Sequence, residues 1–233
     1  MGSIRLLEVQ DIHASYGLIK VLFGVSLRVS PNESVCLLGR NGMGKSTILR
    51  TIAGFLAVDS GTIRFDSIDL TRRPIYERGR LGIAYVPDDK GIFVNLTVAE
   101  NFQVARMRTK NSKNIVRVLE VFPEFRGRLN QVAGTLSGGE QEMLSVARAL
   151  ATGPKLLILD EISQGLAPQV LERIGIALSE VKREGAILLT EQNLKFGCSM
   201  AERVYVIDSG QVVFEGSVSE LYQSHAIEKY MAV

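Results

Sequence analysis

Residues 39–47 carry glycines, a lysine and a hydroxyl side chain in a spacing suited to phosphate binding. The stretch "GRNGMGKST" matches the pattern G-x-x-x-x-G-K-[ST], follows a predicted strand and opens a predicted helix. Its backbone N–H groups would face an anion at a helix N-terminus, Lys45 would neutralise the β- and γ-phosphates, and Ser46 would ligate Mg²⁺. We predict a nucleotide site made of Gly39, Arg40, Asn41, Gly42, Met43, Gly44, Lys45, Ser46 and Thr47.

Two consecutive carboxylates end a later apolar stretch, "KLLILDE". Its apolar residues predict a buried strand, and open α/β sheets bind ligands at the carboxyl ends of their strands. Asp160 would hold Mg²⁺ through water, and Glu161 would act as the general base that polarises the water attacking the γ-phosphate. Such an ending by itself could equally be a charged turn, but its pairing with the phosphate loop favours the catalytic interpretation.

A second glycine-containing loop, "LSGGE" at residues 136–140, precedes a predicted helix and contains no lysine. The helix N-terminus again offers N–H groups and a dipole, so this loop could approach a γ-phosphate from the side opposite the first loop. Because the first loop's ligand is already held by its own sheet, the economical geometry is a head-to-tail pair of chains. We predict that Ser137, Gly138, Gly139 and Glu140 contact ATP across a dimer.

The predicted strands and helices around these residues follow a recognisable order. The first 30 residues read as half-buried strands, and residues from about 90 to 152 carry apolar side chains at helical spacing. After that, short apolar strands alternate with helices, which indicates a parallel sheet covered on both faces. The pattern predicts an α/β domain with a helical insert at about residues 90–152.

The composition is that of an ordinary globular protein. Of the 233 residues, 46% are apolar and 22% are charged, and the net charge of +2 is too balanced to make nucleic acid the main partner. No apolar run approaches the roughly 20 residues of a membrane span. Two cysteines form no disulfide framework, and Cys36 lies in an apolar run that predicts burial. We expect a soluble cytoplasmic protein whose membrane contact comes through a partner.

The phosphate loop, "LSGGE", "LILDE" and "SQGLAP" (residues 163–168), in this order and spacing, resemble the ATP-binding subunit of an ABC transporter over nearly the whole chain. The resemblance implies one domain, residues 1–233, with a P-loop NTPase fold: a mostly parallel sheet core, an antiparallel β subdomain and a helical subdomain insert. It also implies two subunits that sandwich two ATP molecules, with "SQGLAP" meeting its counterpart across the dimer. Hydrolysis would reopen the sandwich and drive a membrane partner.

Other roles carry over from the family to single positions. Tyr16 matches the aromatic residue that stacks on adenine. Residues 88–102 match the segment that docks the permease, and within it the apolar Ile92, Phe93 and Val94 follow a glycine in a loop. These three side chains could instead pack under the insert's own helices, or do both.

Two departures from the family pattern narrow the resemblance. Asp88 stands where a glutamine is usual, and Gln192, in "TEQN", stands where a histidine is usual. Together they resemble the LivF type, the second ATPase of importers for branched-chain amino acids, urea and related amides. Asp88 would reach the metal through water, and Gln192 could donate to a phosphate but carry no proton, which makes Glu161 the better base. Ile162 and Gln164 also differ from the usual residues and remove no ligand.

The resemblance implies a set of catalytic, metal and partner assignments. Catalysis would involve Glu161, Gln192 and Lys45, and Mg²⁺ would be held by Ser46, Asp160 and Asp88. The partners would be permease subunits, a second homologous ATPase or a copy of the same chain, and indirectly an extracytoplasmic solute-binding protein. The chain would lie on the cytoplasmic face of the membrane and bind no nucleic acid.

Two other classes of protein are compatible with parts of the pattern. A soluble ABC-type ATPase acting on DNA or the ribosome would share the motifs, but such proteins typically carry coiled coils or tandem ATPase domains, which this chain lacks. A P-loop kinase or GTPase would use Lys45 but leave "LSGGE" and "SQGLAP" without a role. His13 and His225 are expected to be structural or solvent-facing.

Overall fold

The computed structural model describes residues 5–106 and 113–231, and its centre is a six-stranded sheet. The strands lie in the order β10–β9–β3–β8–β7–β6. Their bounds are Ser34–Leu38 for β3, Ile83–Val86 for β6, Leu156–Asp160 for β7, Ala186–Glu191 for β8, Arg203–Asp208 for β9 and Gln211–Ser217 for β10. Neighbours run parallel except at one edge, where β10 is antiparallel to β9. The mostly parallel core is confirmed.

The carboxyl ends of three adjacent strands meet at one edge of this sheet. β3, β7 and β8 are buried along their whole length and show no apolar–polar alternation, as expected of strands covered on both faces. The register pairs Leu38 of β3 with Glu191 of β8, and Asp160 of β7 with Thr190 of β8. The phosphate loop and the predicted carboxylates therefore leave the sheet side by side.

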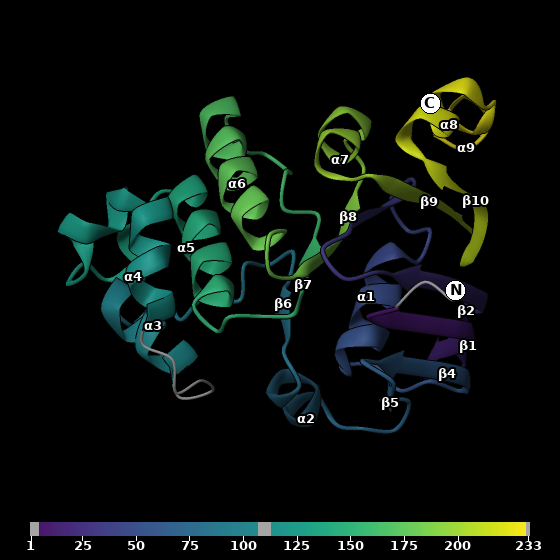
Figure 1. The fold of residues 1–233 in the computed structure, drawn as a ribbon, viewed down its shortest axis with the longest axis horizontal. Helices are drawn as coiled ribbons and strands as arrows, with labels where there is room; N and C mark the ends of the chain where they lie inside the picture. The colour runs from purple at the N-terminus through teal and green to yellow at the C-terminus, as the bar shows by residue number, and fades with distance from the viewer. Residues whose placement is uncertain (1–4, 107–112, 232–233) are drawn as a thin grey trace.

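A second, antiparallel sheet has the strand order β2–β1–β4–β5. Its strands are β1 Leu7–Tyr16, β2 Ile19–Val29, β4 Ser60–Phe65 and β5 Ile68–Asp69. Apolar side chains of this sheet share a core with helix α1 (Lys45–Ala53), whose Ile48, Leu49 and Ile52 are fully buried. Figure 1 shows this sheet and α1 on one side of the central strands and the helices of the insert on the other.

Between β6 and β7 the chain is helical. The elements are α3 Val98–Arg106, α4 Lys113–Val121, the 3₁₀ turns Pro123–Arg128 and Ala133–Thr135, and α5 Gly138–Leu150. α4 ends at Val121, two residues before Pro123, because a proline disfavours helical backbone in the residue that precedes it. Phe102, Phe122 and Phe125 are buried and form the aromatic core of the insert. Residues 107–112 of the predicted insert lie outside the described residues.

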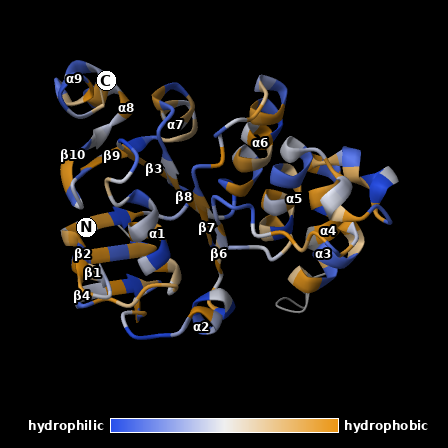
Figure 2. Cartoon of the chain, turned by 180° about the vertical axis from the view of Figure 1, so that it is seen from behind, coloured by the Kyte–Doolittle hydropathy of each residue, from blue (hydrophilic) through white to orange (hydrophobic). Residues whose placement is uncertain are grey.

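The remaining helices cover the central sheet and its edges. They are α2 Ile75–Arg80, α6 Pro168–Val181, α7 Leu194–Met200, α8 Val218–Gln223 and α9 Ala226–Tyr230. Figure 2 shows hydrophobic residues concentrated on the central strands, while the surrounding helices carry both hydrophobic and hydrophilic residues. In the ranges that the structure describes, no helix is long and apolar enough to span a bilayer.

Candidate functional site

The phosphate loop joins the carboxyl end of β3 to the start of α1. Gly44, the residue before the helix, has φ 99°, which glycine adopts without strain. A Cβ at Gly39 would lie 2.3 Å from the backbone oxygen of Ile207, so only glycine fits there. Within residues 5–106 and 113–231, no backbone N–H group of residues 41–44 finds a backbone acceptor. These donors are therefore available to an anion.

The remaining residues of the loop are divided between anchored and exposed positions. The Met43 carbonyl accepts the Gly210 N–H at 3.0 Å, which ties the loop to the β9–β10 turn. Thr47 is buried, and its carbonyl accepts the Thr51 hydroxyl at 2.7 Å. The exposed residues are Arg40, Asn41 and Gly42. The loop thus has a fixed base and an open rim.

Lys45 is buried with its ammonium turned into the loop. Its Nζ donates to the carbonyl oxygens of Gly39 at 2.8 Å and Arg40 at 3.0 Å. The same nitrogen forms an ion pair with Glu161 Oε1 at 2.9 Å. The structure thereby brings together two predicted catalytic residues that lie on different elements.

Ser46 and Asp160, which are both predicted to hold Mg²⁺, are in direct contact. The Ser46 hydroxyl donates to Asp160 Oδ1 at 2.8 Å, and Thr190 and Tyr85 donate to Asp160 Oδ1 and Oδ2 at 2.7 and 3.0 Å. Burial raises the pKa of the Asp160 carboxyl, and these hydrogen bonds oppose that shift because they stabilise the ionised form. Thr190 and Tyr85 were not identified from the sequence.

Glu161 follows β7 in an unusual backbone conformation. Its φ is 47°, in the left-handed region that a glutamate rarely adopts, and its N–H is held by Thr190 through both the carbonyl and the hydroxyl at 3.1 Å. Gln192 is exposed and lines a cavity of about 310 Å³ together with Glu161 and Ser163. Both predicted catalytic side chains, Glu161 and Gln192, therefore face the same space.

Tyr16 and Asp88 lie beside Arg50 of α1. Arg50 Nη2 is 3.4 Å from Asp88 Oδ1, and hydrogen bonds with Tyr85 and Tyr16 raise the pKa of the Arg50 guanidinium. These residues line a cavity of about 550 Å³ to which residues 39–47 do not contribute. The structure does not bring either residue into contact with the phosphate loop, so the adenine contact and the metal role stay predictions.

The second glycine segment is only partly a loop: Leu136 and Ser137 precede α5, whereas Gly138, Gly139 and Glu140, predicted to lie before the helix, form its first turn. Ser137 is the N-cap of this helix: its hydroxyl accepts the Glu140 N–H at 3.3 Å, and the Glu140 carboxylate accepts the Ser137 N–H at 2.8 Å. This reciprocal capping box lowers the pKa of Glu140, chiefly through the Ser137 N–H. Ser137 and Gly138 are exposed. Figure 1 shows the strands β6–β8 between α5 and α1. The two helices that begin at the glycine loops therefore lie on opposite sides of these strands.

The loop after β6 exposes apolar side chains, and a buried side chain of the insert fixes its backbone. Phe93 and Val94 are exposed, whereas Ile92 packs against the core of the insert. The buried Asn101 accepts the Phe93 N–H at 3.0 Å and donates to the Phe93 carbonyl at 3.1 Å, and the Arg148 guanidinium lies 5.1 Å from the Phe93 ring centre. The three residues thus divide between packing and exposure.

Two buried glutamates near the site were not identified from the sequence. Glu191, at the end of β8, accepts both the hydroxyl and the N–H of Ser163, at 2.5 and 3.2 Å. Glu142 of α5 is buried, and in the described part of the chain its Oε1 has no hydrogen-bond partner. Burial raises the pKa of each carboxyl to about 7. Glu191 ends a buried strand just as Asp160 does, and that signal could have found it.

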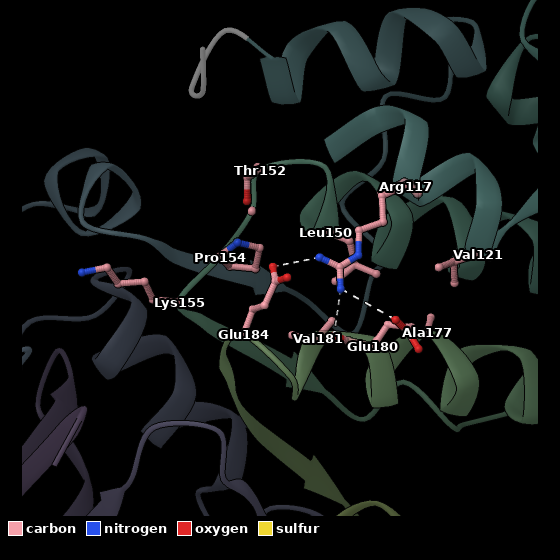
Figure 3. Close-up of a pocket in the computed structure, with 12 residues that line it drawn as sticks. Arg117, Val121, Leu150, Thr152, Pro154, Lys155, Ala177, Glu180, Val181 and Glu184 are labelled. Atoms are coloured by element: carbon pink, nitrogen blue, oxygen red, sulfur yellow. Dashed lines mark hydrogen bonds and ion pairs between the residues drawn. The ribbon is translucent and has the colours of Figure 1, made fainter. Parts of the chain in front are cut away.

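A further cavity, of about 300 Å³, lies between α4, α6 and the segment after α5 (Figure 3). Arg117 crosses it and reaches Glu184 at 2.8 Å and Glu180 at 3.7 Å. Its lining includes no residue of the phosphate loop and neither carboxylate after β7. We assign this cavity to the packing of the insert against α6.

The histidines and cysteines stand apart from this chemistry. His225 is exposed, and His13 lies in β1 with Nε2 3.5 Å from Asp11 Oδ1. Cys36 is fully buried, as predicted. In the part of the chain that the structure describes, no group of three or more His, Cys, Asp or Glu residues could hold a metal ion.

Known proteins match the chain over most of its length. The ABC transporter family model matches residues 22–164. The chain is 40% identical to the high-affinity branched-chain amino acid transport ATP-binding protein BraG of Pseudomonas aeruginosa, covering 93% of this chain and 94% of that protein. It is 35% identical to the probable branched-chain amino acid transport ATP-binding protein LivF of Archaeoglobus fulgidus, covering 96% and 97%.

Two more matches extend the comparison. The lipopolysaccharide export system ATP-binding protein LptB of Haemophilus influenzae is 30% identical, with 97% and 96% of the two chains covered. The structure of the ADP conformation of MJ1267, an ATP-binding cassette of an ABC transporter, superposes with a TM-score of 0.86 at 26% identity over 97% of this chain and 98% of that one. The chain therefore belongs to the ATP-binding subunits of ABC transporters and is an ATPase coupled to transport.

Proposed function

We propose that this ATPase works as one of two cassettes arranged head to tail, and that it energises the import of branched-chain amino acids or related small amides or urea. The observation that carries the proposal is the separation of the two glycine loops. The phosphate loop has free N–H donors and a buried lysine, whereas Ser137 and Gly138 are exposed on another part of the chain. A second cassette would place such a loop over the nucleotide.

Nucleotide binding would use groups that already converge. The N–H groups of residues 41–44 and the α1 N-terminus suit the phosphates. The Lys45 ammonium is shared between two loop carbonyls and Glu161, so bound phosphates would compete with that carboxylate for the lysine. Tyr16 would supply an aromatic face for adenine once its side chain leaves Arg50.

Hydrolysis would depend on Glu161 as the base. Released from Lys45, its carboxylate would take a proton from water as the water oxygen attacks the γ-phosphorus and ADP leaves. Gln192 faces the same cavity and would donate its amide hydrogens to a phosphate oxygen. Because a glutamine cannot exchange a proton at neutral pH, the proton is assigned to Glu161 alone.

Mg²⁺ would be held by Ser46 and Asp160. The Ser46 hydroxyl and Asp160 Oδ1 lie 2.8 Å apart, and both are oxygen ligands of the type that Mg²⁺ prefers. When bound, the ion would neutralise charge on the phosphates. Asp88 is turned to Arg50, so its contribution would be a contact through water after that ion pair opens.

The membrane partner would dock on the exposed loop after β6. Phe93 and Val94 form an apolar pair on a backbone fixed by Asn101, which suits a preformed contact for short permease helices. Such docking would hold the chain on the cytoplasmic face of the membrane.

The cargo is inferred from the relatives. BraG and LivF carry branched-chain amino acid transport in their names and match at higher identity than LptB, whose name states lipopolysaccharide export. The acidic residue at position 88 and the "EQN" stretch point the same way. Import is therefore proposed, with lipopolysaccharide export as the second candidate.

The test is to purify the tagged chain from its native membranes and measure ATP hydrolysis by the intact assembly. We expect a pair of multi-span permeases and a second ATPase to co-purify, and hydrolysis to rise on adding leucine with the matching solute-binding protein. Stimulation by lipopolysaccharide instead would support export. Recovery of ribosomal or nucleic-acid components without any permease would overturn the transport assignment.

A further inference from the structure

We propose that Glu191 is a positioning residue for ATP hydrolysis, which acts by holding Ser163 and with it the backbone that carries Glu161. The inference rests on the proposed role of Glu161 as the base. The sequence assigned no role to Glu191, and the contacts that suggest one join residues 28 positions apart in the chain.

The contact between Glu191 and Ser163 is a two-point clamp. Glu191 Oε2 accepts the Ser163 hydroxyl at 2.5 Å, and Oε1 accepts the Ser163 N–H at 3.2 Å. Glu191 is 1% exposed and Ser163 is 9% exposed, so water competes little for either bond. Two bonds from one carboxylate fix both the side chain and the backbone of the serine.

A neighbouring pair of bonds anchors Glu161 to the same strand end. The Glu161 N–H donates to the carbonyl and the hydroxyl of Thr190, the residue before Glu191. The three-residue segment from Glu161 to Ser163 is therefore held at both ends by consecutive residues of β8. The left-handed φ of Glu161 needs such over-determination, because a glutamate released from these contacts would relax to an ordinary conformation.

The surroundings of Glu191 favour a specific role over simple core packing. An ionised carboxylate at this buried position costs folding free energy, because Glu161 and Glu142 place further negative charge near it. The positive charge of Lys45 offsets part of this cost. On its other side, a Cβ at Gly197 of α7 would lie 3.2 Å from Glu191 Cβ and 2.9 Å from Cys36 Sγ. The glutamate is thus confined on one face by α7 while its carboxylate reaches Ser163.

This arrangement predicts an effect on turnover and little effect on nucleotide binding. Within the phosphate loop, Lys45 bonds the Gly39 and Arg40 carbonyls, and Met43 bonds the β9–β10 turn. The ion pair of Lys45 with Glu161 links the loop to this segment, and bound phosphates would replace that pair. A misplaced Glu161 would still leave the phosphates bound but would aim the base poorly. Misplacement of about 1 Å can cost up to ~100-fold in rate.

The experiment is a double-mutant cycle on ATP hydrolysis by the full chain, with Glu191→Leu, Ser163→Ala and the pair. We expect Glu191→Leu to lower kcat about 10-fold or more with KM for ATP changed less than about 3-fold. Ser163→Ala should lower kcat less, because it keeps the N–H bond. The double variant should equal Glu191→Leu alone, since the two residues act through one contact. Glu191→Gln should fall between, because it retains one acceptor oxygen.

Glu33→Gln is the matched control. Glu33 also accepts a hydrogen bond, from Arg203 Nε at 2.8 Å. It lies just before the first residue of β3, whereas the site lies beyond the last residue of that strand. It should lower thermal stability and leave kcat and KM unchanged. Thermal melting of every variant checks folding, and if Glu191→Leu does not fold, Glu191→Gln and Ser163→Ala decide.

Glu161→Gln separates this inference from the base assignment. In one outcome, Glu161→Gln loses turnover while Ser163→Ala and the folded Glu191 variant (Glu191→Leu or, if that does not fold, Glu191→Gln) both keep the wild-type kcat. In that case Glu191 is not a positioning residue, and the assignment of Glu161 as the base stands. If Glu161→Gln hydrolyses ATP at the wild-type rate, the base assignment itself is wrong. Independent, multiplicative losses in the double variant, or an equal loss in Glu33→Gln, would also overturn the clamp.

Discussion

The two glycine loops of this chain differ in where their binding partners lie. The phosphate loop is built into its own domain: Lys45 bonds two carbonyls and Glu161, and the Met43 carbonyl bonds Gly210. In the segment at residues 136–140, Ser137 and Glu140 bond each other reciprocally, the nearby Arg128 also pairs with Glu140, and Ser137 and Gly138 are exposed.

The difference supports the proposal that one half of the nucleotide site is preformed and that a second cassette supplies the other half. A loop whose polar groups are satisfied locally can stay exposed at little cost in stability. It is then ready to meet a phosphate held by another surface. Four experiments test this difference between the two loops and the surfaces around them.

The largest effect is expected from Glu161→Gln, in the half of the site that contains the phosphate loop. Turnover should fall about 100-fold or more, because the amide cannot accept a proton from water, while ATP affinity should be retained. Steady-state hydrolysis and a nucleotide-binding titration measure the two quantities. Wild-type turnover in this variant would place the base elsewhere.

Mixing two inactive variants tests whether the second half comes from a partner. Lys45→Ala damages the phosphate loop and Ser137→Arg blocks the other loop, so each alone should hydrolyse little ATP. A 1:1 mixture should recover about a quarter of the wild-type rate if the chain pairs with itself, because half of the dimers are mixed and each has one intact site of two. Cross-linking shows whether mixed dimers form; mixed dimers without recovery would contradict the head-to-tail arrangement.

Glu142→Gln tests whether the buried Glu142 carboxyl of α5 makes the free energy of unfolding depend on pH. Burial raises the pKa of Glu142 to about 7 from its ordinary value near 4.5, so the folded chain binds more protons than the unfolded one between these values. The free energy of unfolding should therefore fall as pH rises from 5 to 7.5. The variant should reduce this fall and be more stable at pH 7.5 by on the order of 2 kcal/mol.

Glu140→Gln is the control for that measurement, by chemical denaturation across pH. The pKa of Glu140 is lowered by its bond from Ser137, so its stabilisation is present above its unfolded pKa and is lost as pH falls. Glu140→Gln should leave the decline between pH 5 and 7.5 in place. An unchanged slope in Glu142→Gln would mean that this carboxyl titrates normally.

The smallest effect on the isolated chain is expected from Phe93→Ala. Phe93 is 44% exposed, so loss of its ring should cost less than about 1 kcal/mol of folding stability and leave ATP hydrolysis unchanged. Recovery of the permease in the membrane purification should nevertheless drop. Val116→Ala, which truncates a 61% exposed side chain on α4, should change neither. Equal permease recovery in both variants would remove Phe93 from the docking surface.

Much of the fold was predictable because its signals are local. The apolar, unalternating strands predicted the parallel core, and the pattern around Gly44, Lys45 and Ser46 predicted a strand–loop–helix unit within nine residues. The contacts of Asp160 were harder to foresee. Thr190 and Tyr85, which bond its carboxylate, come from two other strands, and no spacing along the chain links them.

Much of the chemistry can be read from the sequence alone: a lysine in a glycine loop, consecutive carboxylates after a buried strand, and a helix that begins within "LSGGE". These are short-range features, because backbone propensity, capping and strand burial act over a few residues. Three pairings are visible only in the folded chain: Lys45 with Glu161, Arg50 with Asp88, and Glu191 with Ser163. Such pairings depend on strand order and register, which bring distant strand ends to one edge of the sheet.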